Sequence, residues 1–262
     1  MVYRLGLLLC LLLTACSAPR QTTGQANVFE LAGVLAGETV LHDIVHLVAD
    51  VRVPVGARLV IEPGSTILVH STDSTKIDPE FLSSKVELLV EGELVVGAAG
   101  AEPVHVLPYV TVGSEDAGET GWAGIELIAG GVGRFNNVRL SGAETALLVS
   151  GASAVLDQVV VTDNRYGVIL QNGGRFSGTD VLIDRGETGI LCWGEGSLDI
   201  RRGNIVGHDE EGVVLGPGCQ TVLQEVEIRG NDLGLVGSAM ETGRIRFVDN
   251  RVDHLQRVEV GP

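Results

Sequence analysis

The chain is poor in aromatic residues, in basic residues and in long apolar runs. Its 262 residues include 2 Trp, 3 Tyr and 5 Phe, too few to predict a row of rings for stacking on sugars. The 18 Lys and Arg residues against 34 Asp and Glu give a net charge of −16, which argues against nucleic acid and anionic lipid as partners because both repel an acidic surface. The apolar run Leu5–Leu13 is too short to span a bilayer as a permanent helix.

The amino terminus resembles a bacterial lipoprotein signal. The apolar run ends in Leu-Thr-Ala immediately before Cys16. The resemblance implies cleavage after residue 15 and lipidation of Cys16, with several acyl chains forming a lasting membrane anchor. Ser17 follows the cysteine, and in Gram-negative lipoproteins the lack of an aspartate there implies transport to the outer membrane, on its periplasmic or its cell-surface side. An ordinary secretory signal and an uncleaved anchor are the alternatives.

A glycine-headed or alanine-headed apolar box recurs along the second half of the chain. The boxes begin 22, 21, 22, 23 and 22 residues apart, at Gly124, Ala146, Gly167, Gly189, Gly212 and Gly234. A fixed period of this length is typical of a solenoid, in which each repeat buries its core against its neighbours. The boxes are short, rich in branched aliphatic residues and bounded by turn residues, so we expect strands.

Two further strands are predicted in each repeat, which gives an all-β, right-handed parallel β-helix with coils of about 22 residues. One interior column is formed by the second residue of each box: Ile125, Leu147, Val168, Ile190, Val213 and Leu235. The strand preceding each box contributes the inward pairs Val138/Leu140, Val159/Val161, Val181/Ile183, Val226/Ile228 and Ile245/Phe247. The coil that ends at Gly212 has one extra residue, which shifts its pair to Gly203/Ile205.

The first half of the chain resembles the opening coils of bacterial surface proteins of the pectin-lyase-like β-helix superfamily. Residues 53–64 follow the pattern V-P-x-G-x-x-L-x-I-x-P-G, residues 92–96 follow G-x-L-x-V, and Trp122-Ala123-Gly124-Ile125 matches the Trp-x-Gly-Ile step that often opens the regular coils. The resemblance covers roughly residues 38 to 250 and concerns the fold, because function must be argued from a site. We therefore divide the chain into a signal (1–15), a lipidated, flexible tether (16–36) and a single β-helical domain (37–262).

Two cysteines remain once Cys10 is removed with the signal and Cys16 is lipidated. Cys192 falls on the inward column of the boxes, whereas Cys219 lies four residues beyond the next box, near a turn. We expect their Cα atoms to lie too far apart for a disulfide.

Histidines give little evidence of a metal site. His42 and His46 would lie about 13 Å apart in a strand, too far to share a metal ion. His208, between turn residues, is expected to be exposed.

An acidic ridge is predicted at the corner before each box. The carboxylates proposed for it are Asp163, Asp184, Asp209, Glu210 and Asp232. Stacked carboxylates could bind calcium or serve a polysaccharide lyase or glycoside hydrolase. The other interpretation is a solvated ridge of turn residues, with arginines relieving the repulsion. The acids keep no fixed offset from the box, which favours the second interpretation, so no metal ligand and no catalytic residue is assigned.

An apolar stripe is predicted on the outside of the boxes, because side chains alternate along a strand. The outward residue is Glu126 in the first box and aliphatic in the following five: Leu148, Ile169, Leu191, Val214 and Val236. A contiguous apolar patch on an exported protein usually marks an interface. Two alternatives are a stripe that reflects only β-propensity and one covered by the protein's own terminal segment.

The sequence thus favours a non-catalytic, envelope-anchored lipoprotein that acts as a rigid binding or structural scaffold, through a protein partner or self-association. The alternative is a carbohydrate-active enzyme or a carbohydrate-binding module acting on envelope or acidic polysaccharide, with calcium as the one cofactor to consider. Against an enzyme, the coils vary little in length and leave few loops to wall a cleft. The irregular stretches 70–85 and 108–121 are the exceptions.

Overall fold

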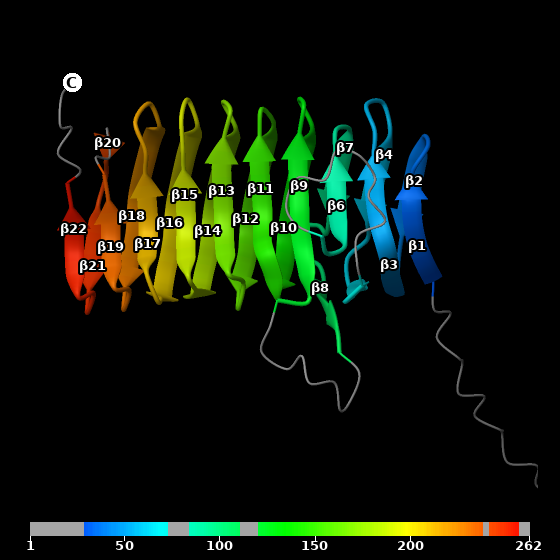
Figure 1. Cartoon of the computed structure of the whole chain (residues 1–262), viewed down its shortest axis with the longest axis horizontal. Helices are drawn as coiled ribbons and strands as arrows, with labels where there is room; N and C mark the ends of the chain where they lie inside the picture. The colour runs from blue at the N-terminus through cyan, green and yellow to red at the C-terminus, as the bar shows by residue number, and fades with distance from the viewer. Residues whose placement is uncertain (1–28, 73–83, 111–119, 238–240, 257–262) are drawn as a thin grey trace, which may run out of the picture.

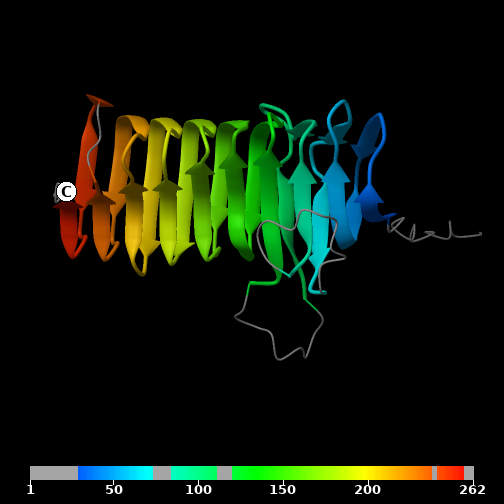
Figure 2. The same cartoon turned by 45° about the horizontal axis from the view of Figure 1, so that its top comes forward.

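The structure, a computed structural model, describes residues 29–72, 84–110, 120–237 and 241–256. It is a parallel β-solenoid of about nine turns with coils about 22 residues apart, which confirms the parallel β-helix expected from the repeats (Figure 1). The first strands (blue) and the last (red) lie at opposite ends of the stack, and Figure 2 shows the coils stacked side by side along the long axis. No helix long and apolar enough to cross a membrane occurs within the described ranges.

Each coil has three faces, which we number in chain order from the box. The first face consists of β6 (Glu87–Val90), β9 (Trp122–Ile128), β11 (Ala143–Ser150), β13 (Tyr166–Gln171), β15 (Thr188–Cys192), β17 (Glu211–Leu215), β19 (Leu233–Val236) and β22 (Val252–Leu255). The second face includes β2 (Glu38–Leu41), β4 (Arg58–Ile61), β7 (Glu93–Val96) and β20 (Glu241–Thr242). The third face includes β5 (Thr66–His70), β8 (Val104–Tyr109) and β21 (Ile245–Val248).

Seven strands turn a corner and contribute to two faces. The second and third faces share β10 (Val132–Ser141), β12 (Ser153–Thr162), β14 (Arg175–Gly186), β16 (Ser197–His208) and β18 (Gln220–Arg229). The third and first faces share β1 (Phe29–Val34) and β3 (Ile44–Val53). β1 lies inside the segment 16–36 that we assigned to the tether, so the first coil begins there.

The register of the regular coils agrees with the sequence prediction. Leu147 pairs with Val168, Val168 with Ile190, Ile190 with Val213, and Val213 with Leu235. The irregular coil also has the predicted shift, because Val181 pairs with Gly203 and Ile183 with Ile205. These side chains form one continuous core, in which each aliphatic side chain contributes roughly 1.5–3 kcal/mol.

The corner between the second and third faces is made by one residue per coil in the left-handed conformation. Asn137, Gln158, Asp180, Arg202 and Glu225 have φ between 51° and 58°. A single residue of this conformation turns the strand without an intervening loop, so the outer surface is concave along this corner.

The prediction that Cys192 and Cys219 stay reduced is wrong, because the two form a disulfide with Cα atoms 6.0 Å apart. The strand after Cys219 pairs beside the strand after Gly196, since Gln220 is opposite Ser197. Gly196 leaves room at the corner: a Cβ there would lie 2.9 Å from the Cys192 sulfur. The turn after β17 therefore brings Cys219 next to Cys192 on the preceding coil. Spacing along the chain does not predict this contact between coils.

A ladder of buried amides supports the corner between the third and first faces. Asn164 accepts a hydrogen bond from Ala143 N–H and donates to the carbonyl of Thr162 (2.9 Å each). Asn231 accepts one from the backbone N–H of His208 and donates to Asn250 Oδ1 (2.9 Å each). The expectation that His208 is exposed is wrong: it is 2% exposed, its Nδ1 lies 2.9 Å from Asn231 Oδ1, and burial lowers its pKa.

Candidate functional site

The predicted apolar stripe lies on the outer side of the first face, but it begins one coil later than the sequence indicated. Ile169, Leu191, Val214 and Val236 are paired in register on successive coils and are half-buried. Leu148, by contrast, is only 4% exposed and does not belong to the accessible surface. Strand periodicity gives the direction of a side chain and not what covers it, which is why Leu148 was included.

Apolar side chains that the sequence analysis left out extend the stripe. Leu255, 48% exposed, pairs beside Val236 on the last coil. Leu233 and Val252, half-buried, form a second outward row next to it. The row Ile169–Leu255 crosses five coils, or about 19 Å at the usual spacing between strands.

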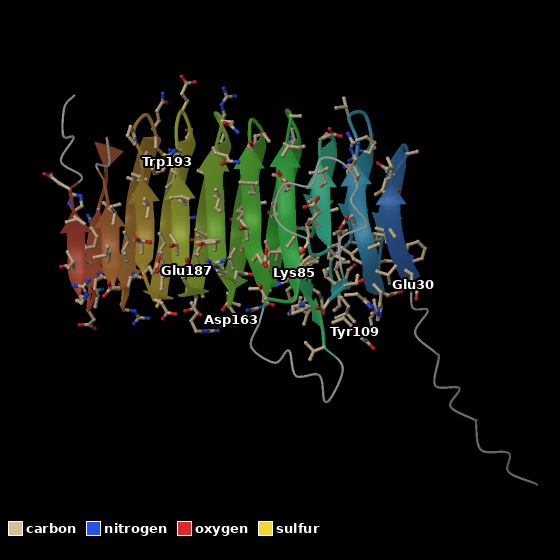
Figure 3. The ribbon with its side chains drawn as sticks, in the orientation of Figure 1. Glu30, Lys85, Tyr109, Asp163, Glu187 and Trp193 are labelled. Carbon is tan, nitrogen blue, oxygen red and sulfur yellow. A yellow bond between two sulfur atoms is a disulfide. The ribbon has the colours of Figure 1, made fainter. Side chains whose placement is uncertain are left out.

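Trp193 borders the stripe at the end of β15 and is 46% exposed. Glu187 directly precedes β15 and Trp193 directly follows it, so the two residues lie at opposite ends of that strand (Figure 3). Tryptophan is enriched among the residues that dominate the binding energy of protein interfaces. The residue that directly follows β15 therefore also contributes to this surface.

Two buried carboxyl groups lie on the first face, in coils that precede the stripe. Glu126 is 0% exposed and Glu87 1% exposed, on neighbouring coils whose strands pair from Glu87 to Val90. No hydrogen-bond partner of either Glu126 carboxyl oxygen is found among the described residues. Burial, and secondarily the charge of Glu87, raises the pKa of Glu126 from 4.5 to about 8. Alternation along the strand predicted an outward direction for Glu126, which did not reveal its burial.

The acidic ridge is largely paired with arginines in the structure. Arg185 donates to Asp163 through Nε (2.6 Å) and Nη2 (2.8 Å), and it also contacts Asp184. Arg251 forms an ion pair with Asp232. The arginine hydrogen bonds lower the pKa values of Asp163 and Asp232. These contacts agree with a solvated ridge whose arginines relieve repulsion.

The same ridge has a shallow hollow of about 500 Å³. Its lining residues include Lys85, Asp163, Arg165 and Glu187. Figure 3 shows Lys85, Asp163 and Glu187 toward the lower edge of the coils. Arg165 and Tyr166 both donate to Glu187 (2.7 Å each), which lowers the pKa of Glu187.

Asp209, also in this lining, and Glu210 are exposed at the next coil. No cluster of three or more metal-ligating side chains is found in the described part of the chain, and the hollow brings cations and anions together in pairs.

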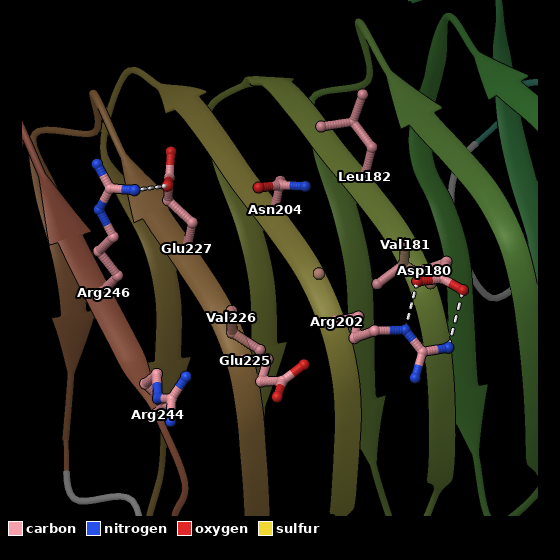
Figure 4. Close-up of a pocket in the computed structure, with 11 residues that line it drawn as sticks. Asp180, Val181, Leu182, Arg202, Asn204, Glu225, Val226, Glu227, Arg244 and Arg246 are labelled. Atoms are coloured by element: carbon pink, nitrogen blue, oxygen red, sulfur yellow. Dashed lines mark hydrogen bonds and ion pairs between the residues drawn. The ribbon is translucent and has the colours of Figure 1, made fainter.

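The concave corner between the second and third faces forms an open groove of about 580 Å³ (Figure 4). Arg202 is held by two hydrogen bonds to Asp180 (2.8 and 2.9 Å), and Arg246 contacts Glu227 at 3.2 Å. Arg244 also lines the groove, and no ion pair joins it to another described residue. The groove crosses β14, β16, β18 and β21, so it runs along the solenoid axis.

The aromatic residues considered for sugar stacking do not lie together. Trp122 is fully buried and donates its Nε1 hydrogen to the carbonyl of Ser141 (3.0 Å). Tyr166 is held by Glu187 on the ridge, and Trp193 lies at the other end of the first face. Cys16 and the signal lie outside the described residues, as does much of the two irregular stretches.

The chain matches no known protein-family profile and no curated protein sequence. Any function must therefore be inferred from the surfaces of the solenoid itself.

Proposed function

We propose that this protein is a non-catalytic, envelope-anchored scaffold that binds a protein surface through the apolar stripe. The observation that carries the proposal is the in-register row Ile169, Leu191, Val214, Val236 and Leu255, with Trp193 at its border. Outward positions of a solvated strand normally hold polar residues. The continuous core favours a rigid support, on which a flat apolar row loses little conformational entropy when it docks.

The proposed location is the outer membrane, to which a lipid on Cys16 would anchor the protein. The lipoprotein-like segment before Cys16 supports it, and the disulfide between Cys192 and Cys219 agrees with an exported protein because disulfides persist in oxidising compartments. The acidic surface makes anionic lipid and nucleic acid poor alternatives for attachment.

Changing Ile169 to Thr and Leu191 to Lys together is expected to abolish association while leaving the fold intact. Both side chains point outward, so the double variant keeps the core columns and places a charge in the centre of the stripe. Light scattering measures self-association of the detergent-solubilised protein, and affinity capture from its own envelope measures other partners. Loss of self-association in light scattering would identify a second copy as the partner. Loss of affinity capture would identify a different protein.

Val155 and Val222 supply the matched control, because they are outward residues on the second face, away from the stripe. The double variant Val155→Thr/Val222→Lys makes the same kind of change and should associate like the parent. Equal association of parent and stripe variant in both assays would contradict the proposal.

Replacing Cys16 with Ala is expected to leave a precursor that is neither lipidated nor cleaved, because lipoprotein signal cleavage requires the modified cysteine. Incorporation of labelled fatty acid and the mass of the purified chain measure both steps. Cys10→Ala, in the apolar run of the signal, is the control and should be labelled normally. Label in the Cys16→Ala protein would show that the lipidation site is assigned wrongly.

A second candidate function is binding or cleavage of acidic polysaccharide, with or without calcium. The groove in Figure 4 supports it, since Arg202, Arg244 and Arg246 line a channel along the solenoid axis. Incubation with uronic-acid polymers, with and without a chelator, separates the two proposals. Release of unsaturated products would favour a lyase, retention without cleavage would favour a carbohydrate-binding module, and neither is expected of the scaffold.

A further inference from the structure

Two histidines that are far apart in sequence lie side by side on the outer side of the third face. His46 belongs to β3 and His70 ends β5, and both side chains are half-buried. The strands pair with His46 opposite Leu68, so His70 is the diagonal neighbour of His46 on the next coil. His46 Nδ1 and His70 Nε2 are 2.8 Å apart.

The side chain of Tyr109 holds the two imidazoles in place. Its ring stacks on His70, with centroids 4.4 Å apart and planes inclined by 14°. Its centroid also lies 5.1 Å from that of His46. The rings are therefore fixed by packing as well as by their mutual contact, which is the kind of support that an ordered ligand pair needs.

The separation of the two nitrogens is close to that of two ligands on one metal ion. A hydrogen bond between two imidazoles requires that only one of the facing nitrogens carries the proton. Two imidazoles at 2.0–2.1 Å from a tetrahedral Zn²⁺ have their nitrogens about 3.3 Å apart. To bind zinc in place of the shared proton, the two nitrogens must move apart by about 0.5 Å, which rotation of the side chains can provide.

Glu30 is placed to supply a third ligand. It is opposite His46 in the pairing of β1 with β3, on the same outward face, and it is exposed. Burial, and then the charge of His46, lowers the pKa of His70, while the charge of Glu30 acts in the opposite direction. The described residues hold no three ligands already in position, so the Glu30 side chain has to turn toward the pair.

We propose that Glu30, His46 and His70 bind one Zn²⁺ ion, with water completing the tetrahedron. Glu30, His46 and His70 belong to β1, β3 and β5, which pair successively. The ion would therefore link the first three coils of the third face. Among the described strands β1 pairs with β3 alone, so the first coil is held by contacts with one neighbour. The bound metal would stabilise that end, because its binding free energy adds to that of folding.

The test is titration of the purified full chain with Zn²⁺ alone, followed by calorimetry. We expect one ion per chain, and affinity that falls as the pH is lowered because protons compete with the metal for its ligands. His46→Gln and His70→Gln should each weaken binding at least about tenfold, since even residues that only support a ligand cost 10–100-fold in affinity. Glu30→Gln should weaken binding by a smaller factor. His105→Gln is the control and should bind like the parent, because His105 pairs beside Thr66, outside the site.

X-ray absorption of the unmodified zinc complex tests the ligands without any substitution and should show two imidazoles. Amide exchange of β1 should slow when zinc is added. No saturable binding, fewer than two imidazoles on the metal, or unchanged affinity in folded His46→Gln and His70→Gln proteins would overturn the proposal.

Discussion

Replacing Val168 with Asp is expected to destabilise the solenoid by at least about 4 kcal/mol and to unfold the coils around it. Val168 is 0% exposed, between Leu147 and Ile190 in the interior column of the first face. The carboxylate would be buried with no partner, and the neighbouring coils bury their own core against this one. Urea denaturation and limited proteolysis measure the effect.

Val168→Ala and Val155→Asp separate the cause of that loss from general damage. The alanine variant removes two methyl groups and should cost only about 2 kcal/mol. Val155 is 50% exposed, and an aspartate there should change stability by no more than about 1 kcal/mol. A protease-resistant Val168→Asp protein would show that the register of the column is wrong.

Glu126→Gln is expected to make the protein more stable at pH 8 and to change little at pH 4.5. The folded-state pKa of Glu126, about 8, lies above the ordinary value of 4.5, so folding opposes ionisation. The protonated carboxyl imposes no such cost below pH 4.5. The cost grows as the pH rises from 4.5 to 8 and is constant above that. At about 1.4 kcal/mol for each pH unit, the free-energy cost of the buried, ionised Glu126 is at most about 5 kcal/mol.

Chemical denaturation of parent and variant at pH 5, 6.5 and 8 measures this difference, and titratable groups that do not interact with Glu126 cancel in the comparison. Glu87→Gln should also flatten the pH dependence, because the Glu87 charge contributes to the raised pKa of Glu126. Glu195→Gln removes an exposed carboxylate and is the control for net charge. A parent and a Glu126→Gln protein with the same pH profile would mean that Glu126 is ionised at neutral pH in the fold.

The repeats were sufficient to predict the architecture and even the shifted pair Gly203/Ile205, because the core of a solenoid repeats with the chain. Periodicity distinguishes inward from outward side chains, and each inward column is a consequence of that alternation.

The burial of outward side chains could not be predicted in this way, because it depends on what packs over them. Glu126 and Leu148 both point outward as predicted and are nevertheless buried. The disulfide was rejected and the pair His46–His70 was overlooked for a related reason: contacts between coils join residues 27 and 24 positions apart. Spacing within one strand pointed to His42 as the neighbour of His46 instead.

The most direct test of the scaffold proposal is site-specific photo-crosslinking in the native envelope. A photoreactive residue at Leu191, in the middle of the stripe, is compared with one at Val155 on the second face. We expect a discrete crosslinked product, with a second copy or another envelope protein, from position 191 and none from position 155. The same products from both positions, or a product from 155 alone, would contradict it.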